Sequence, residues 1–214
     1  GYPSVIRENI ALGKSVSSSN SDYGRNADVI VDGDYSNYWD GGEYPQSFMI
    51  DLGAGYFVDL MKAYPYNDGV RHYLYTIEYS LDGHNFTKLF ERTADMGIAY
   101  AGETFELDEP VEMRFVKVTM TYNSSNPSVH MKEFEIFGEL NPDYVAPVGD
   151  SKDPDNIAYG RKVRTHLAAQ SVANITDGLD VTSCTGEFAP AYFDIDLEEN
   201  YDLSEIILNF PVSG

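Results

Sequence analysis

The run Asn-Ile-Ala-Leu-Gly-Lys-Ser-Val occupies residues 9–16, and Asn-Ile-Ala-Tyr-Gly-Arg-Lys-Val occupies residues 156–163 of the 214-residue chain. The same eight-residue opening therefore occurs twice. A repeat governs the interpretation of everything that follows it, because each copy is expected to form the same structural unit.

The similarity continues at a constant spacing. Asp32-Gly33 is matched by Asp177-Gly178, and Phe48-Met49-Ile50-Asp51-Leu52 is matched by Phe193-Asp194-Ile195-Asp196-Leu197. Both pairs are 145 positions apart (177 − 32 and 193 − 48). A constant offset over this span indicates a duplicated unit rather than a shared composition.

The repeat predicts the domain organisation. We expect a complete module at residues 1–140, a linker at 141–155 and the first part of a second, similar module at 156–214. The linker contains three prolines and four aspartates, so it is expected to be polar and fairly stiff. The second copy has about 59 residues, which is marginal for an independent β domain. We therefore expect a truncated copy, either poorly ordered or packed against a neighbour.

Short alternating runs predict an all-β fold. Phe48, Ile50 and Leu52 alternate with other residues, and the tyrosines of residues 73–79 do the same. Such alternation places one set of side chains on a core face. Residues 115–120 form another strand-like run. Because no long amphipathic helix is evident and turn residues separate the runs, a β-sandwich or barrel is favoured.

Charge and cysteine content exclude several classes. The net charge is −21, which repels nucleic-acid phosphates and anionic membranes but suits cation binding and solubility outside a cell. The single cysteine, Cys184, rules out an intramolecular disulfide, so a metal is the obvious alternative staple. No run of about 18 apolar residues predicts a membrane span.

Five motifs follow one another in a fixed order. They are the opening at 9–16, Val31–Trp39, Ile50–Gly53, Tyr75–Phe86 and Lys132–Gly138. Their order resembles that of a coagulation-factor type C, or discoidin-like, domain, and most of all that of a family 32 carbohydrate-binding module. The resemblance covers nearly all of residues 5–139 and implies a jelly-roll β-sandwich.

The resemblance also implies a structural calcium site. Its side-chain ligands would be Asp32, Asp34, Asn37 and Glu133, and its main-chain carbonyl ligands would come from Val29 and Lys132. Calcium prefers six to eight oxygen ligands of these types. Asn37 replaces the usual threonine or serine, and a plain turn with solvated carboxylates is the alternative interpretation. In the second copy Leu179 stands where the first has Asp34, so we expect no complete second site.

Two loops contain the mixture of rings and polar groups that sugar binding requires. An aromatic face covers the C–H side of a pyranose, while polar side chains fix its hydroxyl groups. The resemblance places sugar contacts in such loops. The candidates are Tyr66, Arg71, His72, Tyr122 and Asn123, with Tyr23, Arg25, Tyr44 and Tyr100 as secondary candidates.

Structural roles compete with binding at these positions. Arg71 could pair with Asp68 as a surface salt bridge, and His72 could be satisfied by a carbonyl. Trp39 is predicted to lie in the core, where its counterpart in the second copy is the small Cys184.

The resulting expectation is a non-catalytic, calcium-stabilised module of a secreted or cell-surface bacterial protein with several modules, and the resemblance implies a glycoside hydrolase as that parent protein. Family members bind terminal galactose, N-acetylgalactosamine, N-acetylglucosamine or fucose. The alternative is an adhesion or structural spacer that binds protein or no ligand. No hydrolase, nucleophile or phosphate-loop motif is present, and the four histidines have no ligand spacing. Nucleic acid is not an expected partner, and lipid binding is the least expected alternative.

Overall fold

The computed structural model describes residues 7–94 and 102–144, and then 156–158, 161–165, 169–170, 172–176, 184–186, 192–197, 200–208 and 210. By their internal contacts the residues form two compact units, 1–146 and 147–214. Three features of the sequence lie outside the described residues: Tyr100, the Asp177-Gly178 pair of the second copy and most of the predicted linker.

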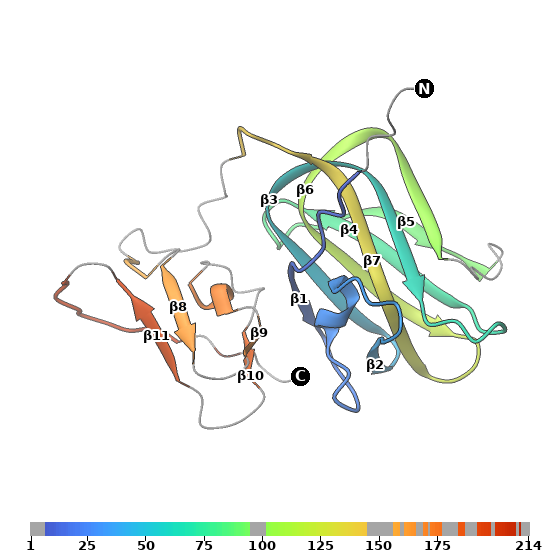
Figure 1. Ribbon diagram of the computed structural model, residues 1–214, viewed down its shortest axis with the longest axis horizontal. Helices are drawn as coiled ribbons and strands as arrows, with labels where there is room; N and C mark the ends of the chain where they lie inside the picture. The colour runs from blue at the N-terminus through green and yellow to red at the C-terminus, as the bar shows by residue number, and fades with distance from the viewer. Residues whose placement is uncertain are drawn as a thin grey trace. The chain divides into compact units, whose positions relative to one another are not determined.

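The first unit is an antiparallel β-sandwich, as the alternating runs predict (Figure 1). The strand order is β2-β7-β3-β6-β4-β5, and β1 pairs with β3 outside this path. A short 3-10 helix, η1 (Ala27–Val31), precedes β2. The strands are β1 (Ser15–Ser18), β2 (Trp39–Glu43), β3 (Gln46–Pro65), β4 (Tyr73–Ser80), β5 (Thr87–Arg92), β6 (Glu103–Asn123) and β7 (Ser128–Leu140).

The long strand β3 joins the two layers of the sandwich. Its first part, Gln46–Asp51, lies between β1 and β6, whereas from Tyr56 onward its neighbours are β6 and β7. The pairing with β6 shifts register between Asp51 and Tyr56. Shifts of this kind bend a strand and increase its twist, so one continuous sheet folds over a single core.

The core consists of the side chains on one face of each alternating run. Phe48, Ile50 and Leu52 are buried on β3, and Tyr75 and Ile77 are buried on β4. Burial of each such side chain stabilises the fold by about 1.5–3 kcal/mol relative to exposure.

Trp39 is fully buried, as predicted, and packs edge to face against Phe48 with ring centroids 5.5 Å apart. Its indole Nε1 donates to the carbonyl oxygen of Asn20 at 2.9 Å. Trp39 is therefore a core residue rather than a binding platform.

The second unit reproduces the first strand pairing of the first unit. Its strand β8 (Lys162–Thr165) pairs antiparallel with β11 (Phe193–Asp196), and Val163 lies opposite Ile195. In the first unit Val16 lies opposite Ile50, which is the same pair of repeat positions.

The remaining described elements of the second unit follow the repeat as well. They are β9 (Ala169–Gln170), β10 (Thr185–Gly186), which pairs with β9, and the 3-10 helix η3 (Val172–Ile175), which stands 145 positions after the start of η1. Cys184 is half-buried. No helix among the described residues is long and apolar enough to cross a membrane.

Candidate functional site

Three loops of the first unit meet at one end of the sandwich. Residues 66–72 connect β3 to β4, and residues 124–127 connect β6 to β7. These loops are neighbours because Tyr73 at the start of β4 lies opposite Asn123 at the end of β6. The third loop precedes β2, which pairs with the start of β7.

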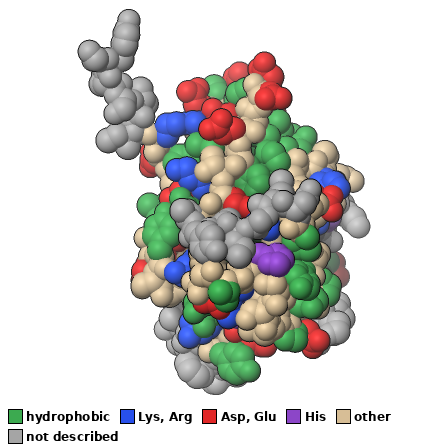
Figure 2. Space-filling view, turned by 90° about the vertical axis from the view of Figure 1, so that its right-hand side faces the viewer, with side chains coloured by type: hydrophobic (Ala, Val, Ile, Leu, Met, Phe, Trp, Pro, Cys, Tyr) green, Lys and Arg blue, Asp and Glu red, His purple; other side chains and the backbone are tan. Residues whose placement is uncertain are grey.

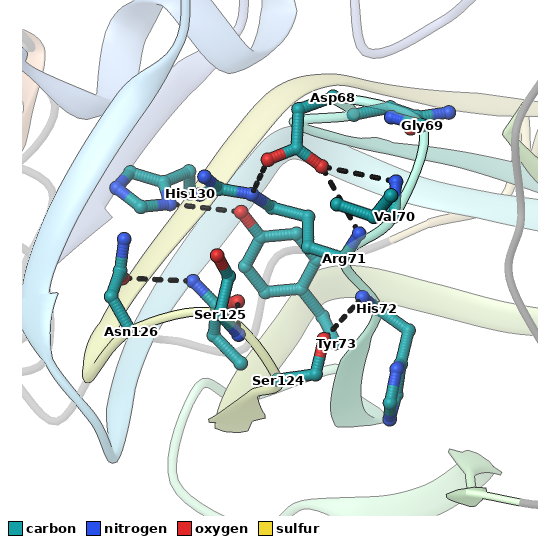
Figure 3. A network of polar contacts seen from close by, with 12 residues as sticks. Asp68, Gly69, Val70, Arg71, His72, Tyr73, Ser124, Ser125, Asn126 and His130 are labelled. Carbon is teal, nitrogen blue, oxygen red and sulfur yellow. Dashed lines mark hydrogen bonds and ion pairs between the residues drawn. The ribbon is translucent and has the colours of Figure 1, made fainter.

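The 66–72 loop is held by its own polar side chains (Figure 3). Asp68 accepts hydrogen bonds from the backbone N–H groups of Val70 and Arg71 and from Arg71 Nε, the last at 2.8 Å. Asn67 Oδ1 accepts from the N–H of Gly69. The bonds from Arg71 lower the pKa of the Asp68 carboxyl to about 2. The salt bridge expected for Arg71 is therefore present, and it fixes the guanidinium over the loop.

Aromatic and cationic side chains surround a small recess beside this loop. Its lining includes Tyr66, Arg71 and His72. The guanidinium carbon of Arg71 lies 4.9 Å from the ring centroid of Tyr66, and the ring of Tyr38 lies 4.9 Å from the same ring. Arg25 covers Tyr38 at 4.0 Å. Lys132 Nζ lies 5.8 Å from the Tyr66 ring centroid. We call the group of Arg25, Tyr38, Tyr66, Arg71 and Lys132 the cationic recess, although only Tyr66 and Arg71 of this group line the small recess itself.

Buried polar groups lie beneath the recess. His130 Nδ1 is 2.8 Å from the hydroxyl oxygen of Tyr73 (Figure 3), and His130 Nε2 is 3.5 Å from Asp40 Oδ2. Burial lowers the pKa of His130, and the nearby Arg71 and Arg25 add to the effect while Asp40 opposes it. Through these two contacts His130 positions Tyr73 and Asp40.

A second aromatic surface adjoins the recess through His72. The His72 ring lies 5.7 Å from Tyr122, and the Tyr122 ring lies 5.8 Å from Tyr44. His72 donates its backbone N–H to Ser124 Oγ at 2.9 Å, which ties the two loops together (Figure 3). Tyr122 is about one-third exposed. This tyrosine platform, Tyr44, His72 and Tyr122, presents ring surface to solvent.

The structure therefore brings four of the five first-choice sugar candidates together, Tyr66 and Arg71 in the recess and His72 and Tyr122 on the platform. Asn123 is the exception. It is buried, its Nδ2 donates to Asn126 Oδ1 and to the carbonyl of Ser128, and its Oδ1 accepts from the N–H of Ser125. Both amide hydrogens of Asn123 and one acceptor position of its Oδ1 are used within the loop, so in this structure Asn123 holds the loop.

Three residues in or beneath the cationic recess were not among the predicted binding candidates: Tyr38, His130 and the side chain of Lys132. Tyr38 lies in the Val31–Trp39 motif and His130 lies in none of the motifs, and only the pairing of β2 with β7 brings them together. In the pairing of β3 with β7, Tyr64 lies opposite Glu133 and the next residue, Pro65, lies opposite Met131. Lys132 therefore has no partner on β3 and forms a bulge. No local sequence signal marks this bulge, although bulges re-aim side chains beside functional sites.

The secondary candidates Tyr23 and Arg25 belong to a tight turn. The N–H of Arg25 donates to the carbonyl of Asp22 at 3.0 Å, and both residues between them, Tyr23 and Gly24, have positive φ. Tyr23 is 89% exposed. A non-glycine residue in this conformation costs about 1 kcal/mol, and such strain is found preferentially at ligand-binding positions.

The proposed calcium ligands lie around the Asp32-Gly33 turn. Asp32 Oδ2 accepts from Asn37 Nδ2 at 3.2 Å, and Glu133 accepts from the N–H of Gly33. Asp34 is turned toward the N–H of Ser36. Among the described residues, no three His, Cys, Asp or Glu side chains lie close enough together to hold a metal. The protein side chains alone therefore do not form a closed cage here.

Two features of this turn nevertheless fit a hard cation. Asn37 Oδ1 is buried and has no hydrogen-bond partner. Glu133 is fully buried, and burial together with the charges of Asp32, Glu135 and Asp34 raises its pKa to about 8. Oxygen donors of this kind are the ligands that calcium prefers, so the residues present suit it chemically.

Comparison with known proteins places this fold. Residues 14–134 match the F5/8 type C domain. The chain belongs to the F5/8 type C domain family. A comparison with curated proteins finds no match.

Several solved structures resemble the F5/8 type C module. The family 32 carbohydrate-binding module of AlyQ, in complex with 4,5-unsaturated mannuronic acid, is 28% identical with a TM-score of 0.52, over 57% of this chain and 93% of that one. A glycoside hydrolase of family 89 from Clostridium perfringens, in complex with GlcNAc-alpha-1,4-galactose, is 27% identical with a TM-score of 0.56, over 62% of this chain. The match spans only 15% of that hydrolase.

A chitosan-binding module from a Paenibacillus species, 24% identical with a TM-score of 0.53 over 61% of this chain and 99% of that one, shares the fold. The expected discoidin-like, all-β module of the carbohydrate-binding type is thus confirmed.

Proposed function

We propose that the first unit is a non-catalytic carbohydrate-binding module whose ligand contacts the tyrosine platform and the adjoining recess. The observation that carries the proposal is the junction at Arg71 and His72. Arg71 contacts Tyr66, and the next residue, His72, contacts Tyr122. Ring surface and fixed polar groups side by side are what a pyranose needs.

The solved relatives support this class of ligand. The AlyQ module was solved with a mannuronic acid derivative, and the Clostridium enzyme with a disaccharide of N-acetylglucosamine and galactose. A terminal sugar of a glycan is the ligand that we propose here, in a secreted or surface protein with several modules. A single site of this kind would have an affinity near millimolar, about −4 kcal/mol.

The experiment is titration of the whole 214-residue chain with a panel of neutral and acidic monosaccharides and disaccharides. We expect at least one to bind, and Tyr122→Ala to weaken that binding at least fivefold. Tyr192→Ala is the matched control, because Tyr192 is an exposed tyrosine of the second unit. No binding by any sugar, or equal loss in both variants, would contradict the proposal.

We also propose that calcium binds at the Asp32-Gly33 turn. The ligands would be the side chains of Asp32, Asp34, Asn37 and Glu133 with the carbonyls of Val29 and Lys132. The bulge at Lys132 takes that residue out of the β3–β7 ladder. The ion would neutralise the buried Glu133 and tie β7 to the turn before β2.

Calcium should stabilise the native state by mass action, because it binds that state alone. Adding calcium to the chelated chain should raise the melting temperature reported by the fluorescence of Trp39, the only tryptophan. An unchanged melting curve in excess chelator would count against the site.

A further inference from the structure

We propose that the cationic recess selects sugars that carry a carboxylate, such as uronic acids. This inference rests on the proposed carbohydrate-binding function and names the substrate class of that site. It starts from a contrast in charge. The whole chain carries −21, with 14 basic side chains against 35 acidic ones, yet Arg25, Arg71 and Lys132 converge on two neighbouring tyrosine rings.

The contacts place these three cations against one pair of neighbouring rings. Arg25 lies 4.0 Å from the Tyr38 ring, whose centroid is 4.9 Å from that of Tyr66. On Tyr66 the guanidinium carbon of Arg71 lies at 4.9 Å and Lys132 Nζ at 5.8 Å. The three cations therefore lie against one pair of contacting tyrosine rings.

Two of these cations have no carboxylate partner. Arg71 is paired with Asp68, but within the described part of the chain no ion pair or side-chain hydrogen bond uses Arg25 or Lys132. The nearby carboxylates are occupied in other ways. Asp40 is buried and accepts from the N–H of Gly42, and Asp22 accepts from Asn20 Nδ2.

Cations without a carboxylate partner are unusual in a chain whose acidic residues outnumber its basic ones by more than two to one. On the face shown in Figure 2, acidic side chains gather at the upper end and basic side chains lie scattered. Where carboxylates are so abundant, two uncompensated cations beside aromatic rings form a site for an external anion. Guanidinium groups bind carboxylates in a bidentate manner.

Two local backbone features, a turn and a bulge, orient the side chains of Arg25 and Lys132. Arg25 follows the strained Tyr23-Gly24 turn, and Lys132 sits at the bulge of β7. Glycine at residue 42 suits the close packing of this turn on β2, because its φ is +75° and a Cβ there would lie 2.6 Å from Asp22 Oδ2. Strained turns and bulges both re-aim side chains and are concentrated at binding sites.

The test uses pairs of probes that differ only at C6. The whole chain is titrated with methyl galacturonide and methyl galactoside, and with methyl glucuronide and methyl glucoside, in 50 mM and 500 mM NaCl. We expect the better acid to bind at least about tenfold more tightly than its neutral partner in low salt. High salt should reduce that ratio, because salt screens exposed charges.

Variants assign the preference to the recess. Arg25→Gln and Lys132→Gln should each lower the acid-to-neutral ratio at least about threefold. Lys88→Gln, which removes an exposed lysine of β5 that pairs with Glu91, should leave the ratio unchanged. An equal effect of all three would show general electrostatics and overturn the assignment.

The outcomes separate this inference from the proposed function. If a neutral sugar binds as well as its acid, the inference fails and carbohydrate binding stands. If no sugar of either kind binds, both fail. A preference for galactose 6-sulfate with none for galacturonide would also overturn the carboxylate assignment.

Discussion

The two copies of the repeat form the same strand pair but bury it to different extents. Val16 lies opposite Ile50 in the first copy, and Val163 lies opposite Ile195 in the second. Ile50 is fully buried, whereas Ile195 is 36% exposed. In the first copy β6 flanks the same part of β3 on the other side, and no such strand occurs among the described residues of the second unit.

The contrast shows that strand pairing can be retained where burial of the paired side chains is not. The hydrogen bond made by the first asparagine of each copy is also retained. Asn9 Oδ1 accepts from the N–H of Ala11 and Asn156 Oδ1 accepts from the N–H of Ala158, both at 3.1 Å. Local sequence thus determines the register of neighbouring strands. Core formation depends on strands that arrive from distant parts of the chain, as expected for a fold rich in long-range contacts.

Truncation of the matched isoleucines should give the largest difference between the copies. Ile50→Ala leaves a cavity in a close-packed core and should destabilise the first unit by about 2–5 kcal/mol. Ile195→Ala removes a partly exposed side chain and should change stability by about 0.5 kcal/mol or less. Urea unfolding followed by Trp39 fluorescence and far-UV circular dichroism measures both. Similar losses would show that burial is equal in the two copies.

The next largest effect should be the pH dependence of the free energy of unfolding in the presence of chelator. It should arise in the first copy. Burial raises the pKa of Glu133 to about 8, so the folded state holds this proton more tightly than the unfolded state does. The associated stability is present below the ordinary pKa near 4.5 and is lost as the pH rises toward 8. The loss should be on the order of 2–4 kcal/mol.

Glu133→Gln is the control for that titration, since it removes the charge and keeps the shape. In chelator its stability should not decline between pH 5 and pH 8 as that of the parent does. Calcium should restore the parent at pH 8, because metal ligands bind in their deprotonated form. Parallel pH profiles of parent and variant would contradict the role of Glu133.

Exchange of one residue between the copies tests the calcium site. Asp34→Leu gives the first copy the residue that the second has at position 179, and it should abolish the calcium-dependent rise in melting temperature. At a hundredfold excess over the dissociation constant, the stabilisation that is lost would be about 2.7 kcal/mol. Leu179→Asp should leave the response of Trp39 unchanged, and a full calcium response in Asp34→Leu would argue against this ligand.

Much of the fold could be predicted because its signals are local. The alternation at Phe48, Ile50 and Leu52 identifies a core face, and the Asp-Gly turns separate strands. The bend of β3 could not be predicted, because it depends on register shifts against β6 rather than on residues of β3 alone.

The candidate site was predicted in part for the same reason. Tyr66, Arg71 and His72 lie in one short loop, and the composition of that loop is visible in the sequence. The contact of Tyr38 with His130, at 5.4 Å, joins the residue before β2 to a residue of β7, and only the β2–β7 pairing brings the two together. Asn123 had the right residue type for binding, but its amide is used inside the loop, which composition alone cannot reveal.

The asparagine that opens each copy provides the smallest test of the comparison. In the first copy Asn9 Oδ1 also accepts from the N–H of Ile136 in β7 at 3.0 Å. Asn9→Ala therefore leaves an N–H of a central strand unsatisfied and should cost about 1–3 kcal/mol by urea unfolding. Asn156→Ala removes only the local bond to Ala158, so it should cost less than about 1 kcal/mol and speed amide exchange at Ala158 alone. If the two substitutions lower the free energy of unfolding equally, the asparagine stabilises each copy only locally. Asn9 would then not connect the opening of the module to its last strand.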